Sequence, residues 1–285
     1  MSIKIRQVIE FNSDFQYFAG FLNHIVQQSS INANVKFQNR KVILEIDETD
    51  KEKVQKFSDE VTKYLPHSLF LGEIDTSNFD GDLEKHNSIS PDYEIAPCNF
   101  CIEELSNETS PHYLDNGYRC SHYSNKGELF LEDEFTYSPN YSENSILLLT
   151  NSAKFDELFI ATDDEKKALF SIEKPTLKLT IRNQELKELT GKKYLFVKAP
   201  WSVKSVLVAI QSKESGFDYL FFNDNDDLKA IVIQDNISFI KANRLLPKLK
   251  NLHENRLLNR FLNILDEANF KNGIGIYLND KSGSI

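Results

Sequence analysis

Glycine is scarce in this chain of 285 residues, of which only 10 are glycine. Loops that enclose a phosphate group use glycine to bring several backbone N–H groups close to it. The segment Gly191-Lys192-Lys193 has no glycine five residues earlier, and neither GxGxxG nor GxSxG occurs. We therefore expect no P-loop, no dinucleotide-binding loop and no serine-hydrolase nucleophile.

Long apolar runs are absent as well. No stretch approaches the about 18 consecutive apolar residues that a transmembrane helix needs. The N-terminus alternates polar and apolar residues, and it lacks the apolar segment and the small-residue cleavage site of a signal peptide. The sequence thus predicts a cytoplasmic protein with no membrane span. In that reducing compartment, clustered cysteines are more often metal ligands than disulfides.

Positive charge is in short supply, with 33 Lys and Arg against 43 Asp and Glu and a formal charge of −10. Such a surface repels nucleic-acid phosphates and anionic lipids, so we expect no nucleic-acid partner. Apolar residues, in contrast, are plentiful: hydrophobic residues make up 40% of the chain and aromatic residues 12%. A chain of this length and composition can form two or three compact units, each with a packed core.

Residues 1–75 have the pattern of one small α+β domain. Apolar runs predict strands at the N-terminus and at 69–71, and a hairpin around a turn at 38–41. Helical spacing predicts one helix capped by Asp14 and another capped within 47–50. The resulting β-α-β-β-α-β order is ferredoxin-like, so one sheet face must be polar or covered by something other than the helices. The residues expected to point inward are Phe15, Phe18, Leu22, Ile25 and Val26 in the first helix and Val54, Phe57, Val61 and Leu65 in the second.

The rest of the chain divides into a linker and two further regions. Residues from 76 to about 95 are polar and typical of a linker, whereas 90–144 carries the cysteines and too few aliphatic residues to form a core unaided. Residues 145–285 predict a mixed α/β domain, whose end either closes a sheet or belongs to a longer protein. Its expected strands are 146–149, 176–181, 194–197, 203–210, 219–222, 230–233 and 273–278, with a long helix over 245–265 that has a break or first turn at Pro247.

The sharpest local signal is the pair Cys98 and Cys101, which is followed after 18 residues by Cys120. A C-x2-C pair directs two thiolates at one point, and a second pair usually completes a tetrahedral zinc site. Here Tyr123 stands where a fourth cysteine is expected, and tyrosine is a poor zinc ligand. The nearest alternative donor is His122. The pattern therefore predicts a structural zinc ion held by three cysteines and one histidine.

Other interpretations of the cysteines remain open at this point. His112 is a second candidate for the fourth ligand. The three thiols could also pack as small hydrophobic groups without a metal, or the C-x2-C pair could be a redox pair. Catalytic zinc is disfavoured because no HExxH motif accompanies the cysteines. His24, which lies among apolar neighbours in the first predicted helix, is expected to be a packed or solvated residue and not a ligand.

Three segments, in order along the chain, are similar to one known family. Residues 13–18 (SDFQYF) look like the motif VGFRPF, and residues 95–105 (IAPCNFCIEEL) look like ATCPDCLxEL. Residues 174–179 (KPTLKL) look like the proline-led strand of a YrdC-like domain. Together they resemble HypF, the carbamoyltransferase of nickel–iron hydrogenase maturation. The resemblance implies an acylphosphatase-like domain, a zinc-finger-like region and a YrdC-like remnant, with hydrogenase subunits or maturation factors as partners.

The sequence departs from this family where the family binds phosphate. The family's phosphate-binding arginine is replaced by Gln16, its loop glycines by Asn12 and Asp14, and its asparagine by Phe37. A glutamine offers neither the charge nor the two-pronged donor that an acyl phosphate needs, and losing such a clamp costs about 3–4 kcal/mol of transition-state stabilisation. We therefore expect a non-catalytic accessory protein. The alternatives are residual carbamoyl or acyl-phosphate turnover, and a zinc-stapled interaction module unrelated to hydrogenases.

Overall fold

A computed structural model describes most of the chain, and the described residues form two compact units. They are residues 2–11, 16–68, 70–83, 89, 96–120, 133–143, 145–223, 230–234, 237–242, 275–278 and 281–284. The first unit contains the described residues up to 89 together with 98–103 and 119–120, and the second contains the others. Within this described part of the chain, no helix has the length and apolar composition needed to cross a membrane.

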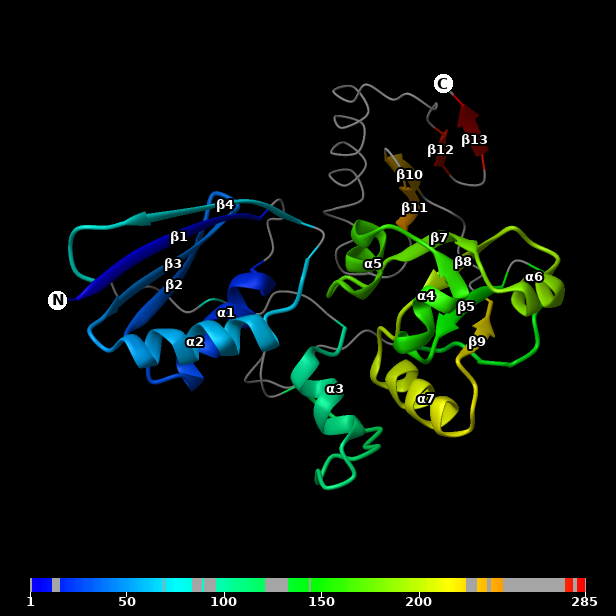
Figure 1. Ribbon diagram of the computed structural model, residues 1–285, viewed down its shortest axis with the longest axis horizontal. Coiled ribbons are helices and arrows are strands. Elements are labelled where there is room, and N and C mark those ends of the chain that lie inside the picture. Colours follow the sequence, from blue (N-terminus) through cyan, green and yellow to red (C-terminus); the bar gives the residue numbers. More distant parts are fainter. Residues whose placement is uncertain are drawn as a thin grey trace. The chain divides into compact units, whose positions relative to one another are not determined.

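The first unit contains the predicted elements in the predicted order (Figure 1). They are β1 (Ile3–Phe11), α1 (Tyr17–Gln28), β2 (Ala33–Gln38), β3 (Lys41–Glu48), α2 (Lys51–Tyr64) and β4 (Leu71–Asn78). The strands form one sheet in the order β2-β3-β1-β4, and every neighbouring pair is antiparallel. Figure 1 shows α1 and α2 on the same side of this sheet. The ferredoxin-like topology expected from the sequence is therefore confirmed.

Short-range signals set the ends of these elements. The turn between β2 and β3 consists of Asn39 and Arg40, whose φ angles of 52° and 58° suit the two-residue turn of a tight hairpin. Asp50 caps α2, since its carboxylate accepts hydrogen bonds from the backbone N–H groups two and three residues later. The start of α1 differs from the prediction: Gln16 occupies the N-cap position, and Asp14 lies outside the described residues.

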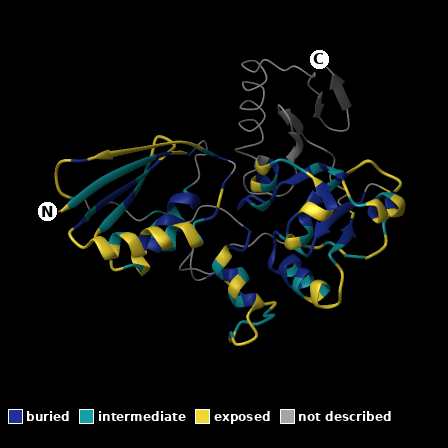
Figure 2. Ribbon diagram, viewed as in Figure 1, coloured by how far each residue is buried: buried dark blue, intermediate teal, exposed yellow. Residues whose placement is uncertain are grey.

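The core of this unit lies between the sheet and the helices. The ring of Phe11 is fully buried, and its centroid lies 5.0 Å from that of Tyr17 and 6.0 Å from that of Phe70. The predicted inward residues of α1 are buried wherever they are described. In α2 only Phe57 is buried, and the other three predicted residues are half-buried. Figure 2 shows the same contrast, with α2 more exposed than α1.

The opposite face of the sheet is mixed, with ion pairs beside the aliphatic pair Val8 and Ile43. Glu45 is paired with Arg6 across β1 and β3, at 2.7 Å, and with Lys36 at 2.9 Å. Burial opposes ionisation of Glu45, but the hydrogen bonds from Lys36 and Arg6 lower its pKa below the usual value. The ring of buried Phe79 lies 5.8 Å from the Lys4 ammonium and 5.4 Å from the Arg6 guanidinium. Ion pairs, one aromatic ring and an aliphatic pair thus share this face.

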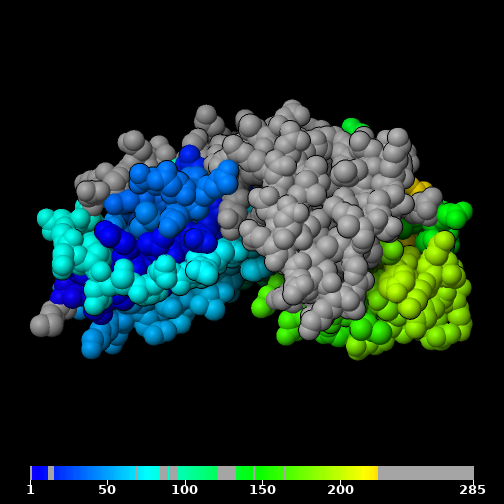
Figure 3. Space-filling model, turned by 90° about the horizontal axis from the view of Figure 1, so that it is seen from above, coloured from blue at the N-terminus to red at the C-terminus, as the bar shows by residue number. Residues whose placement is uncertain are grey.

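Strand β4 differs from the prediction in both extent and character. It runs to Asn78, whereas the sequence predicted a strand at 69–71 and a polar linker from residue 76 onward. It lies at the edge of the sheet, and residues 72–78 are exposed, including Ile74 at 58%. Figure 3 shows the cyan part of the chain, which includes β4, at the surface of the first unit. An edge strand so exposed needs no apolar alternation, which explains why its sequence resembles a linker.

The second unit is built on a larger sheet. Its strands follow the order β13-β12-β10-β11-β7-β8-β5-β9, with β6 paired to β7, and only β5 and β8 are parallel among the pairs described. The predicted strands are confirmed except for 203–210, and the helix predicted over 245–265 lies outside the described residues. The elements from residue 146 onward are β5 (Ile146–Leu149), η1 (Ser152–Lys154), α4 (Phe155–Leu158), β6 (Phe159–Ile160), α5 (Asp163–Phe170), β7 (Thr176–Ile181), α6 (Gln184–Thr190), β8 (Tyr194–Lys198), α7 (Val203–Glu214), β9 (Tyr219–Phe222), β10 (Ala230–Gln234), β11 (Ile237–Ala242), β12 (Gly275–Leu278) and β13 (Lys281–Ser284).

Residues 203–210 were predicted as a strand, and this prediction is wrong because they begin helix α7. Ser202 caps the helix: its hydroxyl accepts a hydrogen bond from the Ser205 N–H at 2.9 Å, and the Ser205 hydroxyl accepts one from the Ser202 N–H at 2.8 Å. These reciprocal bonds form a capping box, which specifies a helix start despite the β-branched residues that follow.

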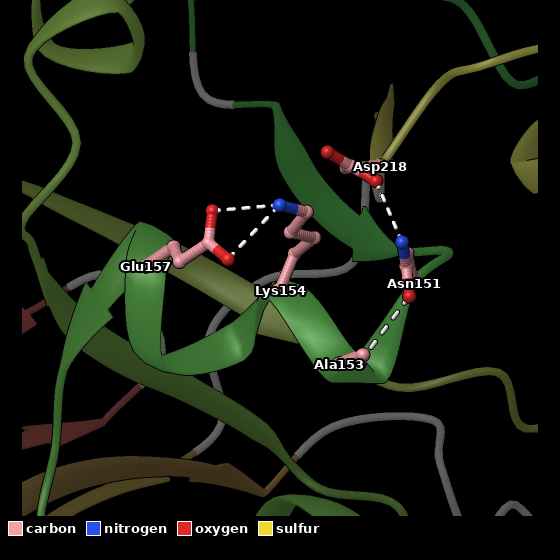
Figure 4. A network of polar contacts seen from close by, with 5 residues as sticks. All are labelled: Asn151, Ala153, Lys154, Glu157 and Asp218. Atoms are coloured by element: carbon pink, nitrogen blue, oxygen red, sulfur yellow. Dashed lines mark hydrogen bonds and ion pairs between the residues drawn. The ribbon is translucent and has the colours of Figure 1, made fainter.

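Polar contacts join the end of β5 to the loop before β9 (Figure 4). The Asn151 side chain donates to Asp218 at 2.8 Å and accepts from the Ala153 N–H at 3.3 Å. The backbone N–H groups of Thr150 and Asn151 also donate to the Asp218 carbonyl, each at 3.1 Å. One turn further on, Lys154 pairs with Glu157 at 2.8 Å. These bonds hold the two connections together at one end of the antiparallel β5–β9 pair.

Candidate metal centre

The C-x2-C pair lies at the start of helix α3 (Asn99–Ser106), which the sequence analysis did not predict. Cys98 immediately precedes the helix and Cys101 lies in its first turn. The carbonyl of Cys98 accepts a hydrogen bond from the Ile102 N–H at 3.0 Å, which closes that turn. The helical turn brings the two sulfur atoms to 3.3 Å from one another. The spacing of the motif thus has a direct geometric consequence.

Cys120 joins this pair, as the sequence predicts. The three sulfur atoms all lie within 4.8 Å of one another, and the residues are only 1%, 0% and 5% exposed. Sulfur ligands of a tetrahedral zinc ion, each at about 2.3 Å from the metal, are about 3.8 Å apart. The three cysteines therefore fit a zinc ion at their centre, although their geometry does not by itself specify the metal.

The pKa values of these thiols reflect three ionisable groups crowded into one buried site. A hydrogen bond from Cys101 lowers the pKa of Cys98, but the contact with Cys120 and burial outweigh it and raise that pKa above the ordinary value. Hydrogen bonds to Cys120 and Cys98, together with burial, raise the pKa of Cys101 as well. Three negative charges cannot share one buried site without compensation. A divalent ion provides that compensation by replacing the thiol protons.

The loop between Cys101 and Cys120 is ordered by local hydrogen bonds. The N–H of Leu114 donates to the carbonyl of Leu105 at the end of α3, at 3.1 Å, and Leu105 is fully buried. Tyr118 is 4% exposed, and its hydroxyl donates to the Glu104 carboxylate. These bonds tie the loop to helix α3.

Among the described residues, the three cysteines have no fourth candidate ligand beside them. The Nδ1 atom of His112 lies 3.5 Å from the Asp115 carboxylate, and its ring meets that of Tyr118 edge-on at 5.1 Å, so this ring belongs to the loop and not to the cysteine cluster. His122 lies outside the described residues and stays a prediction. Within the part of the chain that the structure describes, no histidine or carboxylate joins the three sulfur atoms.

Replacement of the two histidines separates these candidates. We expect His122→Ala to weaken zinc binding by more than about 100-fold, beyond the range of typical outer-shell substitutions, because it removes a ligand. We expect His112→Ala to leave the affinity unchanged, since the His112 ring contacts Asp115 and Tyr118. Zinc titration against a chromophoric chelator measures both. A loss of affinity in His112→Ala alone would reverse the assignment.

Aromatic contacts near the cysteines were not foreseen from the sequence. Phe100, between the two cysteines of the pair, stacks on Tyr64 at the end of α2. The ring of His24, from α1, approaches Phe100 edge-on at 6.2 Å, consistent with the packing role expected for it. The sequence signals that could have indicated these contacts are an aromatic residue inside the C-x2-C motif and another at a helix end.

The positions where the HypF family binds phosphate lack the expected chemistry in the described residues. Gln16 stands at the N-cap of α1 and carries a neutral amide. Phe37 lies in β2, with its ring centroid 6.4 Å from that of the core residue Phe11. Asn12 and Asp14 lie outside the described residues. Thus Gln16 is uncharged, and Phe37 packs near the core.

Comparisons with known proteins agree with the fold described above. No family model and no curated protein sequence matches this chain. Among solved structures, the crystal structure of T. kodakarensis HypF is similar over 78% of this chain and 42% of its own, with a TM-score of 0.52 and 13% identity. The chain has a HypF-like fold. Full-length HypF in its phosphate- and nucleotide-bound form is similar over 88% of this chain and 46% of its own, with a TM-score of 0.38 and 12% identity. The chain therefore spans less than half the length of either HypF structure, and identity this low relates the folds alone.

Proposed function

We propose that the protein is a non-catalytic, HypF-like accessory protein that acts in nickel–iron hydrogenase maturation by binding other proteins. The HypF-like fold supports the proposal. In this proposal residues 1–75 form an acylphosphatase-like domain, 90–144 a zinc-finger-like region and 145–285 a YrdC-like remnant. The protein would act in the cytoplasm, and its partners would be hydrogenase subunits or other maturation factors.

The observation that carries the non-catalytic part is the neutral side chain of Gln16 at the N-terminus of α1. An acyl phosphate is a dianion, and a guanidinium binds it with two parallel charge-assisted hydrogen bonds. An amide supplies one N–H pair and no charge. Phe37 adds to this, because its ring packs near Phe11 and offers no group that could orient a water molecule. Binding is therefore better supported than turnover.

We also propose that Cys98, Cys101, Cys120 and His122 hold a structural zinc ion. When bound, zinc would supply a fixed positive charge that keeps three thiolates together. The surrounding residues would keep water away, since all three cysteines are buried. The ion would then stabilise residues 96–120, a stretch with few aliphatic residues, as part of a binding surface.

Affinity capture of the intact, tagged protein from cells that express a nickel–iron hydrogenase tests the partners. We expect hydrogenase subunits or maturation factors to be enriched over the untagged control. Cys101→Ser is a matched variant, which should recover less of the same proteins if the cysteine region contributes to docking. Reproducible recovery of other proteins, with none from hydrogenase assembly, would support an unrelated zinc-stapled interaction module instead.

A separate assay tests residual catalysis. Wild-type protein is incubated with carbamoyl phosphate, and phosphate release is compared with the protein-free rate. We expect no difference, because Gln16, at the position of the family's arginine, carries no charge. Gln16→Arg is the informative second variant, since it restores the charge at that position. Release by the wild-type protein above background would contradict the non-catalytic assignment.

A further inference from the structure

Phe100 connects the C-x2-C pair to the helices of the first unit. Its ring stacks on that of Tyr64, the last residue of α2, with centroids 3.8 Å apart and an angle of 11° between the planes. The ring of His24 in α1 meets Phe100 nearly at a right angle, at 6.2 Å. Side chains from α1 and α2 therefore contact a residue located between the two cysteines. Paired aromatic rings contribute about 0.5–1.5 kcal/mol beyond the area they bury.

An ion pair accompanies the stack but is the weaker contact. Lys63 lies 3.9 Å from the Glu103 carboxylate on α3, and its ammonium lies 4.4 Å from the centre of the Tyr64 ring. The side chains of Lys63 and Glu103 are 59% and 60% exposed. Ion pairs this exposed contribute little, because water and salt screen them. The stack of Phe100 on Tyr64 is thus a stronger contact between the C-x2-C pair and α2 than this ion pair.

Outside support bears directly on the cysteine pair, because both sulfur atoms lie on one short turn at the start of α3. A backbone hydrogen bond from the Ile102 N–H to the Cys98 carbonyl closes the turn that carries both sulfur atoms. Metal ligands bind an ion tightly when their positions are fixed before the ion arrives. The residues packed around the ligands fix those positions. We infer that Phe100 is a positioning residue for the metal centre: by stacking on Tyr64 it fixes the C-x2-C turn and so raises the affinity for zinc. The inference rests on the proposed zinc site.

Zinc affinity of the full-length protein tests this role. We expect Phe100→Ala to bind zinc about 10–100-fold more weakly than wild type, the range usual for groups that hold metal ligands in place. Phe100→Tyr should bind normally because it keeps the stacked ring. Cobalt substitution gives a second readout, since its visible absorption reports ligand geometry, and Phe100→Ala should broaden or shift those bands.

Further variants keep the result interpretable if Phe100→Ala folds poorly. Tyr64→Ala removes the other ring and leaves the C-x2-C sequence intact, so it should weaken zinc binding by a similar factor. Phe57→Leu is a matched control, because Phe57 is a buried residue of α2 outside the stack and its loss destabilises the same unit. It should leave zinc affinity unchanged.

The two proposals fail in different ways. Wild-type protein that binds no zinc overturns the metal site itself and the positioning role with it. Wild-type protein that binds zinc, with Phe100→Ala and Tyr64→Ala within twofold of it, overturns the positioning role alone. Equal weakening by Phe57→Leu would also overturn it, because the effect would then follow general destabilisation.

Discussion

Replacement of Cys101 by serine is expected to abolish zinc binding, so that the zinc content falls from about one ion per chain to near zero. Cys101 is fully buried and its sulfur lies 3.3 Å from that of Cys98, so no other described donor can take its place. A serine hydroxyl has the size of a thiol but does not ionise to a comparable ligand. Elemental analysis after gel filtration measures the change.

Loss of the ion should also unfold residues 96–120. Structural zinc contributes apparent binding free energies of about 10–16 kcal/mol in small fingers, which is folding free energy for a segment that cannot form a core alone. Limited proteolysis should therefore cut this region in Cys101→Ser and spare it in His112→Ala. Wild-type protein that contains no metal, with an intact region, would instead favour three thiols packed as small hydrophobic residues.

The sequence predicted the first unit well because its signals there are local. Asp50 caps α2, and the turn residues Asn39 and Arg40 produce a hairpin whose register places one strand face against the helices. The failures occurred where environment overrides pattern. Strand β4 has a polar sequence because it lies at an exposed edge, so no periodicity marks residues 72–78.

In the second unit, the sequence predicted a strand where the structure has a helix. The β-branched residues from Val203 onward favour a strand by composition, yet the capping box of Ser202 and Ser205 starts a helix there. Val203, Val206 and Leu207 then lie at helical spacing and are buried. An apolar run this short fits the period of a strand and that of a helix equally well. The hydroxyl groups of Ser202 and Ser205, which form the capping box, decide for the helix.

At the candidate metal centre, the spacing of the cysteines predicted that their three sulfur atoms lie together. A C-x2-C pair at the start of a helix has little geometric freedom. The spacing could not predict the stack of Phe100 on Tyr64, because the tertiary fold brings together these residues from separate helices. Nor could it choose between His112 and His122. That choice depends on the path of the loop, and the structure excludes only the first from the cluster.

Lys174 should make the stability of the second unit depend on pH between about 8 and 10.5. The side chain is 8% exposed, and its ammonium donates to the Phe170 carbonyl at the end of α5, at 3.0 Å. Burial lowers the pKa of Lys174 from 10.5 to about 8, while the neighbouring Glu173 carboxylate opposes the shift. In the window between these values the unfolded chain binds more protons than the folded one, so this contribution to stability rises with pH. It is complete above the unfolded pKa and is lost as the pH falls through the folded pKa.

Comparison with Lys174→Met isolates this contribution. From about pH 7 to about pH 9.5, the unfolding free energy of wild type should rise relative to the variant by about 2 kcal/mol, from 1.4 kcal/mol per pKa unit. The positive φ of 45° at this position affects both pH values alike, so it cancels in the comparison. Urea unfolding followed by the fluorescence of Trp201, the one tryptophan of the chain and buried in the same unit, reports the transition.

Lys174→Arg provides the matched control, because a guanidinium stays charged throughout this pH range. Its stability relative to Lys174→Met should therefore not change between the two pH values, even if the larger side chain lowers the stability at both. A wild-type protein that behaves like Lys174→Arg would show that the ammonium keeps its proton in the folded state. Burial would then be offset by solvation or by the Glu173 carboxylate, and Lys174 would be a charged C-terminal cap of α5 at every pH tested.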